Sequence, residues 1–267
     1  MSPRLHQLLL TSLLVGGSFS ALAHAEMTAE EIMHKNYASN KVKDSRSESV
    51  FRLVDAKGQE RIRNTVGFTR LVEGSTDNMR LVAFTAPADI KGTKTLLIEH
   101  AGADDDIWIF LPAMKKVRRL VSNNKKDSFI GTDFSYGDVI GHKVEDWNHT
   151  LVKEENVQDK DCFVVESKPK TPEITQNSGY SKRVNWIDKK SYVTLKGQLF
   201  DPKGELIKEV SADKVSLVDA KNKKWQAMII EARNVQTGRK TIIEFKKYKA
   251  NTGVPKNIFT PGFLEKN

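Results

Sequence analysis

The histidines and acidic residues of this chain do not form a catalytic or metal-binding pattern. The chain has six histidines, and four of them lie beyond residue 25. These four, His34, His100, His142 and His149, lack the spacing of metal ligands. The run Asp104-Asp105-Asp106 lacks the spaced ligands of a calcium loop and predicts a solvated turn. Residues 26–267 contain no nucleophile elbow, metalloprotease motif or nucleotide-binding loop. We therefore expect no enzymatic activity, no metal and no cofactor.

Residues 105–139 indicate ligand binding rather than catalysis, because an apolar segment is followed by a cluster of cations, which we call the cationic rim. Residues 107–111 are five consecutive apolar residues that end at Pro112. A strand of this kind must be covered on both faces or must face a cavity. The rim consists of Lys115, Lys116, Arg118, Arg119, Lys125 and Lys126. These cations either meet lipid phosphates or an acidic partner, or they protect an exposed edge strand.

A second candidate site is the aromatic segment Phe129–Tyr136, in which Gly131 permits a tight turn. Its rings are Phe129, Phe134 and Tyr136. They either belong to a loop that covers a cavity and moves aside for cargo, or they plug the end of a barrel. Both alternatives bury the rings.

Many strands and few helices must position these residues. Thr28, with Glu31 three residues later, predicts a capping box and a helix over 28–38. Residues 134–139 are short but compatible with a helical turn, and the two prolines of residues 168–179 predict a mobile loop. Strand patterns occur near residues 48–54, 60–73, 79–86, 94–100, 106–111, 116–121, 147–156, 161–168, 180–187, 192–201, 205–217, 225–233 and 239–249.

The connections between these strands indicate an antiparallel architecture. Asp201-Pro202-Lys203-Gly204 predicts a hairpin turn between two of the strands. Because open strand edges invite aggregation, so many antiparallel strands need either a closed barrel or two packed sheets.

The N-terminus predicts export. Residues 1–25 combine an arginine, an apolar stretch over 8–22 and the small-x-small sequence Ala23-His24-Ala25, which together are typical of a cleaved secretory signal. No cysteine follows the cleavage site, and no later stretch approaches the length of a membrane span. We therefore expect residues 26–267 to form one soluble β domain in the periplasm.

The net charge indicates which binding partners to expect, and the cysteine content indicates whether a disulfide can form. The net charge of +9 at pH 7 favours anionic membrane surfaces or acidic partners over nucleic acid in the periplasm, although a solubilising surface explains it equally well. Cys162 is the only cysteine, which excludes an internal disulfide. Its apolar neighbours predict a small buried residue rather than a reactive thiol.

The central block resembles the periplasmic family of outer-membrane lipoprotein-sorting proteins, relatives of the LolA and LolB lipoprotein carriers. The matching residues are Asp106, Trp108, Phe110 where the family has Tyr, Leu111, Pro112, Ala113, Val117, Arg118, Arg119, Ser128, Phe129, Gly131, Thr132, Asp133, Phe134, Ser135, Tyr136 and Asp138. Further family elements are Phe84 with residues 87–93, residues 180–184 leading to Trp186, Thr237-Gly238 and Phe259-Thr260-Pro261.

The resemblance implies a mainly β fold, a half-open and strongly curved antiparallel barrel whose helices cover an apolar cavity. It implies a periplasmic carrier or chaperone that binds a lipid or lipoprotein acyl chains and moves them toward the outer membrane, together with an inner-membrane lipid exporter. The alternatives are an envelope-stress sensor of lipidated ligands and a lipid-modifying enzyme. A polar dyad among apolar walls would favour the enzyme.

A concave sheet presents alternate residues inward, which suggests a cavity lining. The lining candidates lie in or near the matched blocks and are Phe84, Leu97, Trp108, Phe110, Phe129, Phe134, Tyr136 and Trp186. Trp108 and Phe110 are expected to point to opposite faces of their strand. The cationic rim is the candidate for transient contact with an anionic membrane or a partner.

Overall fold

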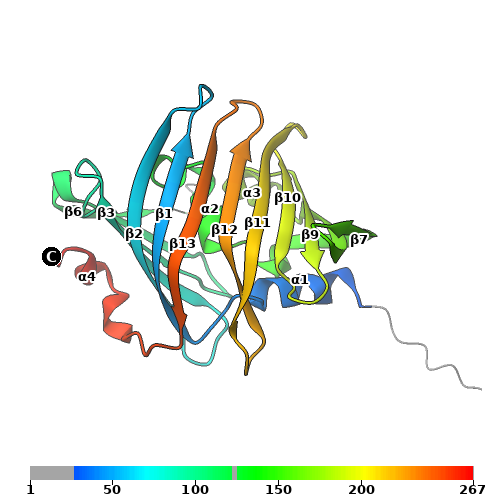
Figure 1. Cartoon of the computed structure of the whole chain (residues 1–267), viewed down its shortest axis with the longest axis horizontal. Coiled ribbons are helices and arrows are strands. Elements are labelled where there is room, and N and C mark those ends of the chain that lie inside the picture. Colours follow the sequence, from blue (N-terminus) through cyan, green and yellow to red (C-terminus); the bar gives the residue numbers. More distant parts are fainter. Residues whose placement is uncertain (1–26, 122–124, 267) are drawn as a thin grey trace, which may run out of the picture.

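The alternating segments pair in one antiparallel sheet of thirteen strands, in a computed structural model that describes residues 27–121 and 125–266. Its order is β6-β5-β4-β3-β2-β1-β13-β12-β11-β10-β9-β8-β7. The strands are β1 Asp44–Val54, β2 Glu60–Leu71, β3 Asn78–Ala86, β4 Lys94–Ile98, β5 Asp106–Leu111, β6 Lys116–Leu120, β7 Trp147–Val157, β8 Lys160–Pro169, β9 Lys182–Asp188, β10 Thr194–Phe200, β11 Leu206–Asp219, β12 Lys224–Asn234 and β13 Lys240–Ala250. The sheet curves around the helices but does not close, so the expected half-open barrel is confirmed (Figure 1).

Short helices occupy the concave side and the two ends of this sheet (Figure 1). They are α1 Ala29–Ala38, α2 Tyr136–Ile140, α3 Pro172–Ser178 and α4 Pro261–Leu264, with 3-10 turns at Pro112–Met114, Phe129–Gly131, Val144–Asp146 and Lys256–Ile258. The predicted capping box is confirmed, since Thr28 Oγ1 accepts from the Glu31 backbone and the Glu31 carboxylate accepts from the Thr28 backbone. No helix among residues 27–121 and 125–266 is long and apolar enough to cross a membrane. The expected signal sequence lies outside the described residues.

The predicted mobile loop over 168–179 is wrong, because most of it is helix α3. The Thr171 side chain accepts a hydrogen bond from the Ile174 backbone, Pro172 occupies the first turn, and Gly179 ends the helix with a φ of 78°. Proline is compatible with a first helical turn, where its missing N–H would have no intrahelical partner. The prolines therefore mark the start of a helix here.

The sheet buries apolar residues on both of its faces. On the concave face one cluster joins β1, β3, β4, β5, β12 and β13 with the segment 129–140. On the outer face a second cluster joins β3 and β4 to the C-terminal segment 254–264, whose red ribbon lies beside β2 and β3 in Figure 1. Both Trp108 and Phe110 pack in this outer cluster. The expectation that they point in opposite directions is wrong, because residues two apart on a regular strand share a face.

We predict that Leu264→Ala lowers the free energy of unfolding by about 2–5 kcal/mol, the usual cost of truncating a buried leucine. Leu264 is fully buried in the outer cluster, and its carbonyl accepts a hydrogen bond from Lys94 Nζ at 3.2 Å. Urea denaturation measures the change. The control Met114→Ala, at a side chain that is 42% exposed, should change stability by less than about 0.5 kcal/mol. Equal effects would show that the C-terminal segment is not part of the core.

Candidate functional site

A cavity of about 440 Å³ lies between the concave face of the sheet and helices α1 and α2. This volume is typical of small-molecule sites, which span about 300–1,000 Å³. On β1 every second residue lines it: Ser45, Ser47, Ser49 and Phe51, as strand alternation requires. Gly67 faces it from β2, where a Cβ atom would lie only 2.7 Å from Ser47 Oγ. Small residues on these strands keep the space open.

One wall of the cavity is apolar and belongs to the concave-face cluster. The residues that both line the cavity and belong to this cluster are Phe51, Val82, Phe129, Phe134, Val139, Ile140, Val210, Ile230, Ile243 and Phe245. Phe84 does not line the cavity but contacts two rings that do: its ring centroid lies 6.0 Å from that of Phe51 and 6.3 Å from that of Phe129. The wall is thus supported by packed aromatic side chains.

Two of the sequence-predicted lining residues, Phe129 and Phe134, reach the cavity. Phe84, Leu97 and Tyr136 lie in the same cluster but do not line the cavity. The remaining candidates lie elsewhere: Trp108 and Phe110 in the outer cluster, and Trp186 in a cluster with Cys162, Val164 and Leu195. Cys162 is fully buried, as predicted. Contact of these residues with lipid stays a prediction.

The segment Phe129–Tyr136 packs into the concave side of the sheet rather than over its outside. Gly131 turns the chain at a φ of 73°. Side chains of the sheet hold the segment in place: Arg63 donates to the Ile130 carbonyl, and Thr241 Oγ1 donates to Asp133 at 2.7 Å. The segment therefore forms part of the cavity wall, whereas its movement for cargo stays a prediction.

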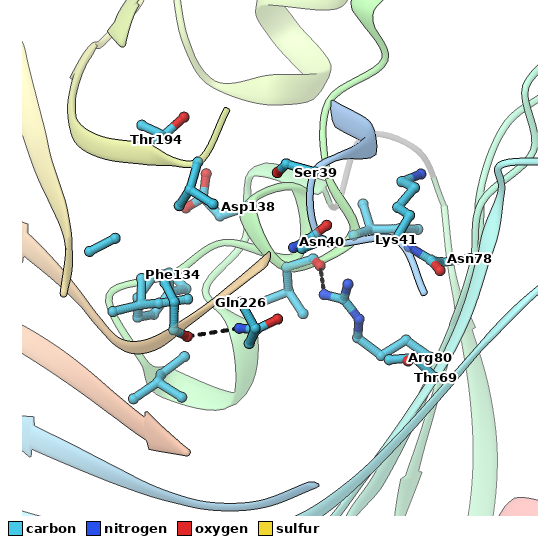
Figure 2. A pocket seen from close by; sticks show the side chains of 18 of the residues that line it. Ser39, Asn40, Lys41, Thr69, Asn78, Arg80, Phe134, Asp138, Thr194 and Gln226 are labelled. Atoms are coloured by element: carbon cyan, nitrogen blue, oxygen red, sulfur yellow. Dashed lines mark hydrogen bonds between the residues drawn. The ribbon is translucent and has the colours of Figure 1, made fainter. Parts of the chain in front are cut away.

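A polar group around Glu99 forms a second wall. Figure 2 shows Lys41, Asn78 and Arg80 on one side of the cavity and Phe134 on the other. The Glu99 carboxylate accepts from Lys41 Nζ at 2.5 Å, from Tyr37 Oη at 2.9 Å and from the Asn78 backbone at 3.0 Å. Burial lowers the pKa of Lys41, although the charge of Glu99 opposes this shift. These charges are mutually satisfied and serve the fold.

A third polar group centres on Asp138 of α2. Its carboxylate accepts from Lys208 Nζ at 2.5 Å, from Tyr180 Oη at 3.1 Å and from the Ser135 backbone at 2.8 Å. Burial alone would raise the pKa of Asp138, but the charge of Lys208 and the nearby His142 hold it well below its usual range. The Asp138 carboxylate is therefore ionised and fully engaged at neutral pH.

His142 and Arg183 line the cavity next to this group. Burial lowers the pKa of His142 to about 4, and the positive charge of Arg183 acts in the same direction. The His142 ring is therefore neutral at pH 7. Its Nε2 atom lies 3.6 Å from Asp138 Oδ1 and has no hydrogen-bond partner. Burial also lowers the pKa of Arg183, to about 10, so this guanidinium stays charged.

The cationic rim divides into exposed and paired residues. Lys115, Lys116 and Arg118 are exposed, and the last two lie on β6, which is the edge strand of the sheet. Lys126 is also exposed, in the loop that follows. Arg119 is paired with Asp106 at 2.5 Å. Lys125 contacts Asp105 at 2.6 Å.

The acidic run beside the rim differs from the expected solvated turn. Asp105 is buried, and it accepts a hydrogen bond from the His100 backbone at 3.0 Å in addition to its contact with Lys125. Asp106 begins β5. The prediction of a solvated turn is therefore wrong for both aspartates, because Asp105 is buried beside Lys125 and Asp106 is a strand residue paired with Arg119.

Comparison with known proteins places this site in a family context. A family model described as Uncharacterized protein matches residues 76–266. The chain is 31% identical to a domain from Vibrio parahaemolyticus assigned to the outer membrane lipoprotein-sorting proteins, over 89% of this chain and 98% of that chain, with a TM-score of 0.81. A DUF1329 family protein from Desulfovibrio piger is 26% identical over 88% and 97% of the two chains, with a TM-score of 0.81.

A LolA superfamily protein from Nitrosomonas europaea has the same fold. It is 18% identical, covers 89% of this chain and 100% of its own length, and has a TM-score of 0.68. No match was found among curated proteins.

We predict that His142→Gln makes the stability of the protein less sensitive to acid. The folded-state pKa of about 4 lies below the ordinary value near 6.5, so the unfolded state takes up the proton first as the pH falls. His142 therefore contributes a stability loss that begins near pH 6.5 and is complete near pH 4, on the order of 3 kcal/mol.

Urea denaturation between about pH 7 and pH 4 measures this slope. The exposed Gln236 provides the control, since its side chain does not titrate and Gln236→Ala should leave the slope unchanged. An identical slope for wild type and His142→Gln would contradict the depressed pKa.

Proposed function

The chain belongs to the family of LolA-like outer-membrane lipoprotein-sorting proteins, and from this premise we propose that it is a periplasmic lipid carrier. It binds a lipid or the acyl chains of a lipoprotein in its cavity and moves them toward the outer membrane. The supply of cargo by an inner-membrane lipid exporter is an expectation from the resemblance. The proposal includes cleavage of residues 1–25 as a signal sequence, after which residues 26–267 act as one domain.

The observation that carries this proposal is the cavity with its continuous apolar wall inside an open-edged sheet. A methylene group occupies roughly the space of one water molecule, about 30 Å³. On that scale the cavity of about 440 Å³ accommodates one acyl chain of roughly 15 methylenes. We therefore expect the cavity to hold one acyl chain at a time. A lipid with about three acyl chains would fit only if the apolar wall of the cavity moved.

Shielding such a chain from water is energetically necessary. Exposure costs about 0.8 kcal/mol per methylene, so a 16-carbon chain is penalised by on the order of 12 kcal/mol in the aqueous periplasm. A carrier must also release its cargo, which requires an affinity that a membrane or an acceptor can overcome. A cavity built partly of small polar residues such as Ser45, Ser47 and Ser49 covers the chain less tightly than a fully apolar core would.

The exposed cations Lys115, Lys116 and Arg118 support a transient contact with anionic membranes. Lys116 and Arg118 lie on β6, the edge strand of the sheet, and Lys115 directly precedes it. The same cations also discourage pairing of the edge strand with another chain. The two roles are compatible, and only the first depends on lipid charge.

The polar pair Asp138 and His142 raises the alternative that the protein is a lipid-modifying enzyme. The Asp138 carboxylate is already engaged by Lys208, Tyr180 and the Ser135 backbone. A histidine with a pKa of about 4 is a weak proton acceptor at neutral pH, where efficient general bases have values near 7. The pair is therefore poorly suited to acid–base catalysis, and the carrier is the better account of the cavity.

We predict that Ile230→Trp reduces binding of a fluorescent fatty-acid probe by at least about tenfold, because the added ring fills the cavity that Ile230 lines. Its effect on stability should be small, within about 1 kcal/mol, since the side chain enters open space rather than packed core. Probe titration and thermal unfolding measure the two effects.

The matched control is Ile229→Trp, which changes the same residue type at the next position of β12 and on the opposite face of the strand. This variant should bind the probe as the wild type does. Equal binding by both variants would remove the cavity as the lipid site. Conversion of the lipid to a product by the wild-type protein would favour the enzyme.

We also predict that simultaneous reversal of Lys115, Lys116 and Arg118 to glutamate weakens association with vesicles that contain anionic lipid. Each cation near such a surface contributes on the order of 1 kcal/mol, so the triple change should weaken binding by about a hundredfold at low salt. Added salt should weaken the wild-type association in the same way.

Vesicle sedimentation measures this association. Reversal of the exposed lysines Lys203, Lys221 and Lys223, which lie in hairpin turns elsewhere, gives the same change in net charge and serves as the control. Unchanged binding in the folded triple variant would reduce the role of β6 to protection of an edge strand.

A further inference from the structure

Arg183 differs from the other buried cations of the described chain. Three lysine or arginine residues among residues 27–121 and 125–266 are buried, Lys41, Arg183 and Lys208. Lys41 contacts Glu99 and Lys208 contacts Asp138, both at 2.5 Å. Arg183 is 92% buried, yet its side chain forms no ion pair and donates no hydrogen bond to another described residue, and its Nε atom is fully buried without a partner.

The guanidinium of Arg183 is held in place by an aromatic ring. Its central carbon lies 4.0 Å from the centre of the Trp147 ring, and Trp147 is itself only 2% exposed. Stacking of this kind fixes the plane of a guanidinium and favours its charge. The strand β9 carries Arg183 toward the cavity that it lines. The group is therefore oriented by the protein, and although the charges of Asp138 and Asp146 attract it, neither carboxylate forms a direct ion pair with it.

His142 adds a second unsatisfied polar atom at the same place. Its ring contacts the Trp147 ring at 5.7 Å between centroids, so His142 and Arg183 share Trp147 as a neighbour. His142 Nε2 lies 3.6 Å from Asp138 Oδ1, beyond ordinary hydrogen-bond distance, and His142 lines the same cavity. Two buried polar groups that converge on a cavity without partners are unusual, since buried polar groups are generally hydrogen-bonded.

The apolar wall continues directly from this point. Leu199 lies opposite Arg183 in the register of β9 and β10, and it lines the cavity. Leu199 packs in one cluster with Trp147 and Val210, and Val210 also contacts the concave-face cluster. A ligand whose polar end reaches Arg183 can therefore place its hydrocarbon along a continuous apolar surface.

We propose that the carrier selects amphiphiles with an acidic headgroup, and that Arg183, stacked on Trp147 beside His142, binds the carboxylate or phosphate of that headgroup. This proposal rests on the proposed carrier function. A guanidinium presents its N–H groups in a fork that matches the oxygen atoms of either anion. The hydrocarbon of the same ligand then lies against Leu199, Val210 and the concave-face cluster.

Neighbouring charges support an anion rather than a neutral group. The charged side chains that line the cavity are Lys41, Arg80, Arg183, Glu99 and Asp138. Glu99 is neutralised by Lys41, Asp138 is neutralised by Lys208, and Arg80 donates to the Val139 carbonyl. The lining thus presents two guanidinium charges with no carboxylate partner, Arg80 and Arg183. An acidic headgroup balances this excess.

Three ligands with the same alkyl chain test the proposal on delipidated protein: dodecanoate, dodecyl phosphate and dodecanol. We expect the wild type to bind at least one of the two acids about tenfold or more tightly than the alcohol, because a hydrogen bond to a charged group contributes about that factor or more. The acid that binds more tightly identifies the headgroup. Isothermal titration calorimetry measures all three affinities.

The variant Arg183→Met should weaken binding of the preferred acid on the order of tenfold to a hundredfold and leave binding of dodecanol within about twofold. Its melting temperature should stay the same or rise, because the substitution removes a buried charge that lacks a partner. Arg183→Lys should keep part of the preference for the acid, since it retains the charge without the fork. Arg61→Met, at an exposed arginine on β2 that does not line the cavity, is the matched control and should change no affinity.

The possible results separate this proposal from the carrier function. If dodecanol and both acids bind equally and Arg183→Met changes none of them, the carrier stands and the headgroup proposal fails. If Arg183→Met lowers the melting temperature and weakens all three ligands alike, Arg183 serves the fold and the proposal fails. If the wild type binds none of the ligands, the carrier function itself fails.

Discussion

The buried ion pair between Asp138 and Lys208 is the contact on which the cavity depends. Asp138 belongs to the segment between β6 and β7, and Lys208 belongs to β11, so their contact at 2.5 Å joins that segment to the opposite part of the sheet. Either charge alone would be strongly unfavourable in this position, because a buried unpaired ion costs several kcal/mol. The pair therefore fixes where the segment lies. Since the segment is held at this point instead of collapsing over the whole concave face, space remains between it and the sheet.

The two faces of the sheet use similar apolar strands for different purposes. On the outer face the C-terminal segment covers Trp108 and Phe110 and completes a packed core. On the concave face the segment 129–140 covers the strands only in part, and small residues such as Ser47 and Gly67 keep the side chains apart. Core and ligand site are thus separated by a single layer of backbone.

The polar groups in the cavity fall into two kinds. Glu99 and Asp138 are surrounded by donors and hold the surrounding elements together. Arg183 and His142 are oriented by Trp147 but have polar atoms without partners. Groups of the second kind reduce stability, and proteins commonly accept such a loss where a side chain must meet a ligand. Because Arg183 and His142 differ in this way from Glu99 and Asp138, we assign recognition of the headgroup to the part of the cavity next to Trp147.

Local sequence patterns determined the helix that follows Thr28 and the thirteen strands, because capping and strand alternation act between near neighbours. The sequence also contained the signals for helix α3, because Thr171, Pro172 and Gly179 are ordinary residues for the ends of a helix. The prolines of this segment nevertheless led to the prediction of a loop. The common face of Trp108 and Phe110 follows from the two-residue period of a strand, but only the distant C-terminal segment decided that this face is the outer one. The polar site could not be predicted as a site, although Asp138 and Arg183 lie in segments that carry the family resemblance. Arg183, His142, Trp147 and Lys208 come from separate elements with no characteristic spacing, and burial and pairing of charges arise only when the strand register and the inserted segment bring those elements together.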